Sequence, residues 1–366
     1  MQNEQNANKK NRNSNIEILR IIAMIMIVAH HFELYAVYNV FNNSELMSYV
    51  NIVIRAKGKI GVDIFILISG YFLIKSKINV KRVLKLWLQI LFYSIGIMLV
   101  FKIFINNNIT IKQMLKYALP ISYRKYWFAS TYMYLCLLIP YINKFVSNVN
   151  QKTYRNLIIV LTFLFSIMYS VLYKSNYYQT EVGTFETLTW FIYLYLLAGY
   201  IRIHGINFLE KNKTEKVLTV LVCIIFILFL CIIHFINIRY KRLIDLIDYY
   251  TKMNSIFILT ISVCLFYTFK NMKLKQNKVV NNISSVAFSV YLISEHNLIR
   301  MPLWNIVRTY MGKYNINEII IILLVVILLF FIAYIIEKVR VTLFERNIFK
   351  LTKINELCDK LDKYLE

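Results

Sequence analysis

The stretch IIIILLVVILLFFIAYII, residues 319–336, decides the fold class of this chain. These 18 consecutive residues carry no charge, and about 20 apolar helical residues cross a bilayer core of roughly 30 Å. Residues 217–236 are nearly as apolar. Strands of a membrane barrel would alternate polar and apolar residues, and these two runs do not. The chain is therefore predicted to be an all-α integral membrane protein.

Composition points the same way, because 58% of the 366 residues are hydrophobic and only 17% are charged. Windows of about 20 residues predict a bundle of ten membrane-spanning helices. Outside this membrane domain, residues 16–345, we expect a disordered tail over residues 1–15 and a second tail over residues 346–366. The ten predicted spans lie near residues 16–38, 58–75, 83–105, 126–145, 155–173, 186–203, 216–237, 250–269, 283–304 and 318–337.

The charge balance supports a topology. With 43 Lys and Arg against 19 Asp and Glu, the net charge is +24, which in a soluble chain would favour a nucleic acid partner. In a membrane protein the excess follows from cytoplasmic loops, which collect Lys and Arg. With the amino terminus inside, about 26 cations fall on the cytoplasmic side and about 16 outside. We expect a multi-pass protein of the cell membrane with both tails cytoplasmic, the lipid bilayer as a partner and no nucleic acid.

Two histidines stand inside the first predicted span, in the stretch MIVAHHFELY, residues 26–35. A charged residue in a span costs roughly 2.5 to 3.5 kcal/mol on insertion scales, so polar side chains there are functional candidates. Arg20 and His31 are eleven residues apart and share one helix face, about 16 Å apart along the axis. His31 alone could simply bond a neighbouring helix. Its register with Arg20, and the nearby His30 and Glu33, favour a function.

Polar and small residues around the second span have two interpretations each. Asp63 and Ser69 add polar atoms, while Gly58, Gly61 and Gly70 would let another helix approach closely. A group of cations follows the span and either anchors topology, attracts anionic lipid or binds the phosphates of a cytosolic cofactor. These cations are Lys75, Lys77, Lys81, Arg82 and Lys85.

The ninth predicted span contains Glu295, His296 and Arg300. His296 and Arg300 are four residues apart, so they share one helix face. These residues either serve a function or mark the outer end of the helix.

The order of these segments resembles that of the acyltransferase 3 family of bacterial integral-membrane acyltransferases. The resemblance runs from about residue 16 to residue 305. It implies a multi-helix enzyme that uses cytosolic acyl-CoA, commonly acetyl-CoA, to O-acylate cell-envelope carbohydrates. The segments that carry it are IEILRIIAMIMIVAHHF, GVDIFILISGYFL, KRVLK, YWFASTYMYLCLLIPYI and ISSVAFSVYLISEHNLIR.

The resemblance also implies roles for particular residues. It makes His31, Arg20 and Asp63 the expected catalytic residues. It makes Arg82, Lys85, Lys81 and Ser69 the expected binding residues for the acyl-CoA donor. Its remaining matches are Gly61, Phe65, Gly70 and Trp127.

The chain departs from the family pattern at several positions. Glu17 stands where an aspartate is usual, which keeps the charge. Lys85 replaces an arginine and loses the planar fork that binds phosphate with two hydrogen bonds. Ser294 stands where many relatives have a histidine, so His296 is a candidate substitute. Because no extracellular esterase-like domain follows the spans, we expect the chain to complete the transfer alone or to pass the acyl group to a separate extracellular partner.

The mechanism expected from the resemblance places acetyl-CoA at the cytoplasmic mouth, with its thioester reaching toward His31. A neutral imidazole there could act as general base on a sugar hydroxyl or carry the acyl group itself. No metal is expected, because His30 and His31 are adjacent and no third ligand is evident. The rival interpretation is a transporter that exports a glycan or a lipid-linked sugar, with these residues lining its pathway. A non-catalytic membrane scaffold would leave the register of Arg20 and His31 without a purpose.

Overall fold

The computed structural model describes residues 13–37, 45–77, 79–105, 108–172, 187–210, 214–240, 244–314 and 317–365. Within these ranges the chain contains helices and no strand, so the all-α prediction is confirmed. Five helical segments are long and apolar enough to cross a membrane, as an all-helical membrane protein requires. They are Ser14–Val37, Val80–Phe104, Gln151–Val171, Thr214–Tyr240 and Glu318–Ile348. Two shorter helices, Leu188–Ile203 and Ile256–Asn271, are also apolar, and the total of ten spans stays a prediction.

The helices follow one another along the chain. In chain order they are α2 (Ser14–Phe32) with η1 (Glu33–Val37), α3 (Glu45–Leu73), α4 (Val80–Phe104), α5 (Ile111–Ala118), α6 (Trp127–Ser147), α7 (Gln151–Thr162) with η2 (Phe163–Ile167) and α8 (Met168–Val171), α9 (Leu188–Ile203), α10 (Asn207–Glu210), α11 (Thr214–Tyr240), α12 (Ile244–Tyr250), α13 (Ile256–Asn271), α14 (Lys278–Ser285), α15 (Ala287–Ser294), α16 (Asn297–Tyr314), α17 (Glu318–Arg340) with η4 (Val341–Glu345), α18 (Arg346–Ile348) and α19 (Thr352–Leu365).

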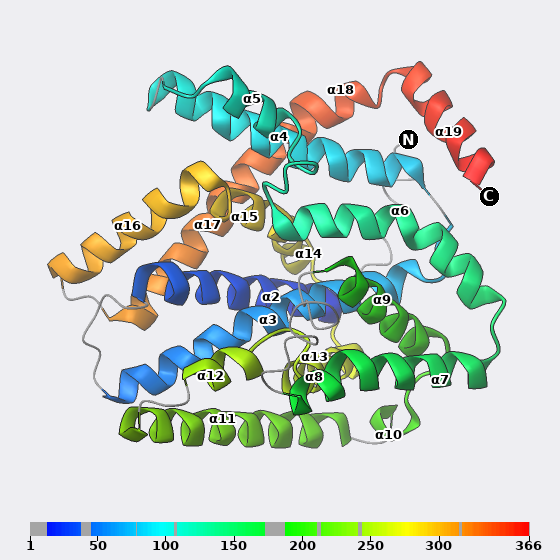
Figure 1. The fold of residues 1–366 in the computed structure, drawn as a ribbon. Coiled ribbons are helices and arrows are strands. Elements are labelled where there is room, and N and C mark those ends of the chain that lie inside the picture. Colours follow the sequence, from blue (N-terminus) through cyan, green and yellow to red (C-terminus); the bar gives the residue numbers. More distant parts are fainter. Residues whose placement is uncertain are drawn as a thin grey trace.

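The bundle is organised around α2 and α3. These two helices cross near its middle, α7 and α11 run along one edge, and α4 and α5 lie on the opposite edge (Figure 1). The start of α2 and the end of α19 lie toward the same end of the bundle (Figure 1). The number of membrane crossings and the side of the membrane on which this end lies stay predictions.

Glycines on α3 allow the central helices to come close together. A Cβ atom at Gly61 would lie 2.5 Å from the carbonyl oxygen of Ala23 on α2. At Gly70 it would lie 2.7 Å from the carbonyl oxygen of Tyr195 on α9. A Cβ at Gly58 would overlap the side chain of His30. The predicted close approach is confirmed, because each glycine fits where a larger residue would push a neighbouring helix away.

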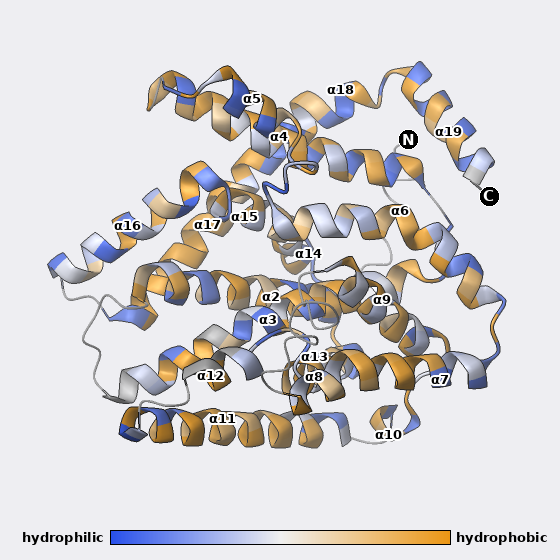
Figure 2. Cartoon of the chain, viewed as in Figure 1, coloured by the Kyte–Doolittle hydropathy of each residue, from blue (hydrophilic) through white to orange (hydrophobic). Residues whose placement is uncertain are grey.

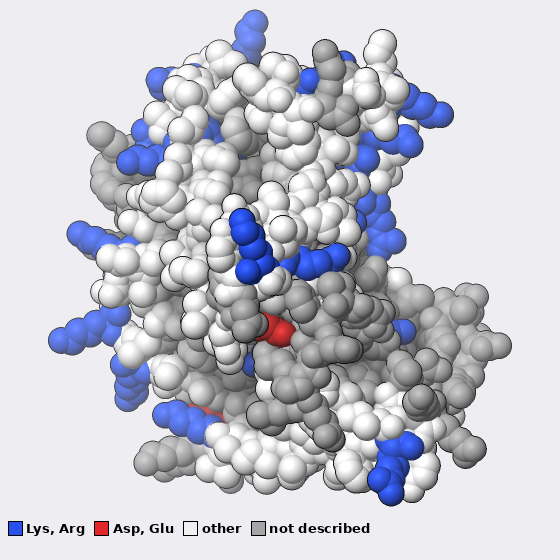
Figure 3. All heavy atoms as spheres, turned by 90° about the vertical axis from the view of Figure 1, so that its left-hand side faces the viewer, with Lys and Arg blue, Asp and Glu red and all other residues white. Residues whose placement is uncertain are grey.

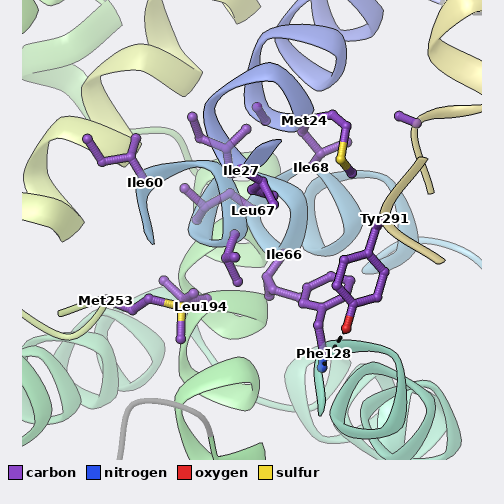
Figure 4. Packing of buried hydrophobic residues seen from close by; sticks show 14 of the residues in the cluster. Met24, Ile27, Ile60, Ile66, Leu67, Ile68, Phe128, Leu194, Met253 and Tyr291 are labelled. Carbon is purple, nitrogen blue, oxygen red and sulfur yellow. Dashed lines mark hydrogen bonds between the residues drawn. The ribbon is translucent and has the colours of Figure 1, made fainter. Parts of the chain in front are cut away.

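The interior of the bundle is apolar, and so is much of its surface. Figure 4 shows Met24 and Ile27 of α2 packed with Leu67 of α3 and Leu194 of α9. The outer helices are hydrophobic as well, most plainly α11 in Figure 2. On α17 the side chain of Ile327 is 66% exposed, a degree of exposure that suits contact with lipid rather than water.

Two segments differ from their predicted form, and a third had no predicted form. Helix α2 begins at Ser14, and Ser14 and Asn15 are buried, so the predicted disordered tail does not include them; residues 1–12 lie outside the described residues. The segment 283–304, expected as one span, is divided among α14, α15 and α16. The tail after residue 345 is helical and packs on α4, where the backbone N–H of Val80 donates to Asp362 at 2.7 Å.

Candidate active site

A cavity of about 190 Å³ lies beside α2, toward the end of the bundle away from the chain termini. Water occupies roughly 30 Å³ per molecule in the liquid, so this cavity has room for several water molecules and is larger than an ordinary packing defect. Its lining combines apolar side chains with a few polar ones, as small-molecule sites usually do. The lining residues are Met24, Ile27, His30, His31, Leu34, Tyr35, Gly58, Lys59, Val62, Phe65, Trp127, Phe128, Phe288, Tyr291, Glu295 and Arg300.

His31 reaches the cavity because α2 is continuous from Ser14 into η1. Met24, Ile27, His31 and Tyr35 follow one another at spacings of three or four residues, which places them on one stripe of the helix. The same stripe continues to Arg20, four residues before Met24. Arg20 does not line the cavity, and about 16 Å of helix axis separates it from His31.

The imidazole of His31 faces a carboxylate from a distant part of the sequence. His31 is 8% exposed, and its Nδ1 atom lies 3.1 Å from Oε1 of Glu295. The angles of a hydrogen bond are not met, and among the described residues neither atom has another hydrogen-bond partner. The other carboxylate oxygen of Glu295 lies 3.5 Å from the guanidinium of Arg300. Arg300 in turn lies over the ring of Tyr35, 5.1 Å from its centre.

A break in the helix brings Glu295 to this position. Helix α15 ends at Ser294 and α16 begins at Asn297, so Glu295 sits at a helix end in the protein interior. Sequence reasoning singled out Glu295 but did not pair it with His31. The available signal was an acid, a histidine and an arginine within six residues of an otherwise apolar segment.

His296 holds this break in place and does not line the cavity. Its Nδ1 atom accepts a hydrogen bond from the backbone N–H of Leu298 at 3.2 Å, while Nε2 lies 3.3 Å from the carbonyl oxygen of Ser94. The ring stacks on Tyr117 with centroids 5.2 Å apart. Both ring nitrogens are therefore occupied, so His296 has a structural position rather than that of a substitute catalytic histidine.

Arg20 belongs to a second polar group, nearer the chain termini. Its guanidinium lies 2.7 Å from Glu17, and Glu17 also accepts a hydrogen bond from Ser284 of α14. Ser69, another predicted residue, accepts a hydrogen bond from Tyr132 at 3.1 Å. Neither Arg20 nor Ser69 lines the cavity.

Asp63 is placed away from both groups. It is fully buried, does not line the cavity and accepts a hydrogen bond from Trp190 of α9 at 3.0 Å. Val62 and Phe65 face the cavity instead, and Asp63 lies about 100° around the helix from Val62. The geometry gives Asp63 the position of a link between α3 and α9.

The basic residues at the start of α4 are not equivalent. Lys85 forms an ion pair with Glu345 at 3.0 Å. Lys85 and Lys81 both lie over the ring of Phe349, 5.2 and 5.3 Å from its centre. Arg82 is exposed and forms no ion pair within the described part of the chain. Of these three cations, Arg82 is the one that is exposed as a whole residue, while Lys81 and Lys85 are partly buried.

Aromatic and polar contacts lead from α6 to the cavity. Tyr132 lies one turn before Cys136 on α6. The ring of Tyr132 stacks on Phe128, which lines the cavity, with centroids 5.8 Å apart. Figure 4 shows the next contact, in which the backbone N–H of Phe128 donates to the hydroxyl of Tyr291 at 3.2 Å.

Within the described ranges, no three His, Cys, Asp or Glu side chains gather closely enough to hold a metal ion.

Comparison with known proteins supplies the family. No curated protein and no solved structure is significantly similar to the chain. A family described as an acyltransferase domain matches residues 13–338 of the 366 residues. The match includes His31, Glu295, Arg20 and Arg82. The chain therefore belongs to the acyltransferase 3 family and is a membrane-bound acyltransferase.

Proposed function

We propose that this protein is an O-acyltransferase of the cell membrane that moves an acyl group, preferentially acetyl, from cytosolic acyl-CoA to a hydroxyl of a cell-surface polysaccharide or other envelope glycan. The observation that carries the proposal is the buried pairing of His31 and Glu295 beside a cavity. Arg82 is exposed at the start of α4, and the hydroxyl of Tyr132 on α6 donates to Ser69 on α3.

Acetyl-CoA would act as the donor co-substrate, with its phosphates at the exposed Arg82. Arginine binds phosphate oxygens through two parallel hydrogen bonds, and Lys81 adds charge nearby. Lys85 is less suited because Glu345 already neutralises it. The donor arm would pass Ser69 and Tyr132 and bring its thioester to His31.

His31 would act as general base. With Nδ1 held toward Glu295, the neutral imidazole keeps the lone pair of Nε2 for the acceptor hydroxyl. His31 takes the hydroxyl proton as the oxygen attacks the thioester carbonyl. When the C–S bond breaks, the imidazolium returns this proton to the departing CoA sulfur. Glu295 stabilises the imidazolium between the two steps, which is the usual contribution of a carboxylate beside a catalytic histidine.

The acceptor would approach from the end of the bundle away from the chain termini. The cavity lies toward that end, beside the last turns of α2. Either the glycan itself or a separate extracellular partner that carries the acyl group onward could present the hydroxyl. Both would use the same base.

The test is a thiol-release assay on the purified protein in nanodiscs, supplied with acetyl-CoA and envelope glycan. We expect His31→Gln to lower kcat by about 10² to 10⁴, the range for loss of a general base. His204→Gln is the matched control, because His204 ends α9 outside the cavity. Unchanged thiol release in His31→Gln would contradict the proposal. Passage of glycan across vesicles without consumption of acetyl-CoA would establish the transporter instead.

A further inference from the structure

The side chains that line the cavity include more cations than carboxylates. Its lining contains two cations, Lys59 and Arg300, and one carboxylate, Glu295, so it sums to +1 when both histidines are neutral. We propose that Lys59 and Arg300 bind a negatively charged group on the acceptor, a carboxylate or a phosphate, close to the hydroxyl that is acylated. The inference deepens the proposed acyltransfer and rests on it.

Arg300 has hydrogen-bonding capacity left for such a group. Its contact with Glu295 is 3.5 Å, longer than the 2.7 to 2.9 Å typical of a charged N–H···O hydrogen bond. Its Nε atom is buried and has no hydrogen-bond partner among the described residues. A guanidinium offers five N–H donors in one plane, so it can hold Glu295 and a second anion together.

Lys59 reaches the cavity from α3, whereas Arg300 reaches it from α16. Lys59 follows Gly58, whose missing side chain lets α3 lie against His30, and this contact brings Lys59 to the same level as His31. Lys57 stands two residues earlier on α3, but it is exposed and does not line the cavity. The two lysines therefore differ in position and share length, charge and helix.

The neighbouring helix α16 is basic as well. It carries Arg300, Arg308 and Lys313 and no acidic residue. Arg308 donates to the backbone oxygen of Tyr35, so this helix lies against the end of α2. Among the described residues on this side of the molecule, Figure 3 shows Lys and Arg side chains more plainly than Asp and Glu.

An anionic lipid headgroup would offer the same chemistry as an anionic sugar. The acceptor is the better match, because Arg300 and His31 both contact the carboxylate of Glu295 and therefore lie next to each other. A group bound by Arg300 is therefore bound next to the base that must meet the acceptor hydroxyl.

The experiment compares three acceptor oligosaccharides of equal length: one neutral, one with a uronic acid and one with a phosphodiester. The protein is held in nanodiscs of zwitterionic lipid, and kcat/KM is measured with saturating acetyl-CoA. We expect the anionic acceptors to exceed the neutral one by about tenfold or more, as one charged hydrogen bond allows. Raising the salt from about 0.01 to 1 M should shrink this preference, since the screening length falls from about 30 to 3 Å.

Variants assign the preference to the cavity. Lys59→Gln should lower the ratio of anionic to neutral kcat/KM by about tenfold, while Lys59→Arg retains most of it. Lys57→Gln is the control and should leave the ratio as in the wild type. Thermal unfolding of each variant separates loss of fold from loss of charge.

Three outcomes would overturn the inference. The first is a neutral acceptor used as well as the anionic ones while thiol release continues, which leaves the acyltransfer itself intact. The second is an equal fall for neutral and anionic acceptors in Lys59→Gln, which would make Lys59 a general transition-state group. The third is loss of the acceptor preference when anionic lipid is added to the nanodiscs, which would assign the site to a headgroup. Absence of thiol release with every acceptor would instead refute the acyltransfer.

Discussion

The two polar regions of the bundle differ in how completely their charges are paired. Near the chain termini, Arg20 lies 2.7 Å from Glu17, Lys85 lies 3.0 Å from Glu345, and Arg340 lies 2.8 Å from Glu337. Around the cavity, His31 and Glu295 lie 3.1 Å apart without hydrogen-bond geometry, and Arg300 reaches Glu295 only at 3.5 Å.

The difference separates charges that hold helices together from charges that are available to substrates. Buried polar atoms are normally satisfied, so the incomplete pairing of Nδ1 of His31, Oε1 of Glu295 and Nε of Arg300 at one cavity is what a substrate site needs. The pairs near the termini have shorter contacts. Arg82 is the exception there, and in the proposed function its exposed charge binds the donor.

The largest expected effect tests the loosely paired region. Glu295→Gln removes the charge that stabilises the imidazolium of His31, so we expect kcat to fall by about 10² to 10⁴ while the protein stays folded. Because both residues act on one proton transfer, the double variant His31→Gln/Glu295→Gln should lose little more than either single variant. Glu318→Gln is the control, since Glu318 lies outside the cavity. Full additivity in the double variant would show that the two side chains work independently.

A smaller effect is expected at the residue that holds the helix break. His296→Phe keeps a ring against Tyr117 and removes the hydrogen bonds to Leu298 and Ser94. Glu295 then loses its fixed position, and we expect about tenfold lower kcat with an unchanged KM for acetyl-CoA. The measurement is steady-state kinetics on the purified variant. A change in KM for acetyl-CoA with kcat intact would connect His296 to donor binding instead.

The next prediction sharpens the contrast among the basic residues of α4. Arg82→Gln removes the exposed charge, so we expect KM for acetyl-CoA to rise about tenfold, the value of one charged hydrogen bond. Lys85→Gln removes a lysine already paired with Glu345, and we expect a smaller rise in KM. Binding of the CoA product by calorimetry checks both variants. The reverse order of effects would show that the donor displaces Glu345 from Lys85.

The smallest effect on activity is expected at Asp63. Trp190→Phe leaves the buried carboxylate of Asp63 without its indole donor, which should lower the free energy of unfolding by about 1 to 3 kcal/mol. Because neither residue lines the cavity, kcat per folded molecule should stay near that of the wild type. Thermal unfolding and the thiol assay on one preparation give both values. A loss of kcat with normal stability would instead show that Asp63 takes part in the reaction.

Sequence reasoning was most successful where one helix contains the whole pattern. The stripe from Arg20 to His31 needs only the helical repeat, and α2 is continuous over that length. The close approach at Gly61 also follows from local residue type, since a helix without side chains at one point can be packed closely.

Pairings between distant segments could not be predicted in the same way. Glu295 is 264 residues from His31, and Glu345 is 260 residues from Lys85, so both contacts depend on how the helices are arranged. The break at Glu295 was missed because the residues before it, AFSVYLIS, are apolar enough to continue a helix. The break depends on tertiary contacts of His296 with Ser94 and Tyr117, which the local sequence does not show.

The most direct test of the central claim places donor and acceptor on opposite sides of one membrane. The protein is reconstituted in sealed vesicles of known orientation, with labelled acetyl-CoA on the side of Arg82 and glycan on the other side. We predict that label reaches the glycan across the intact membrane and that His31→Gln abolishes this transfer. Labelling of the glycan only when acetyl-CoA is placed on the same side as the glycan would contradict the account.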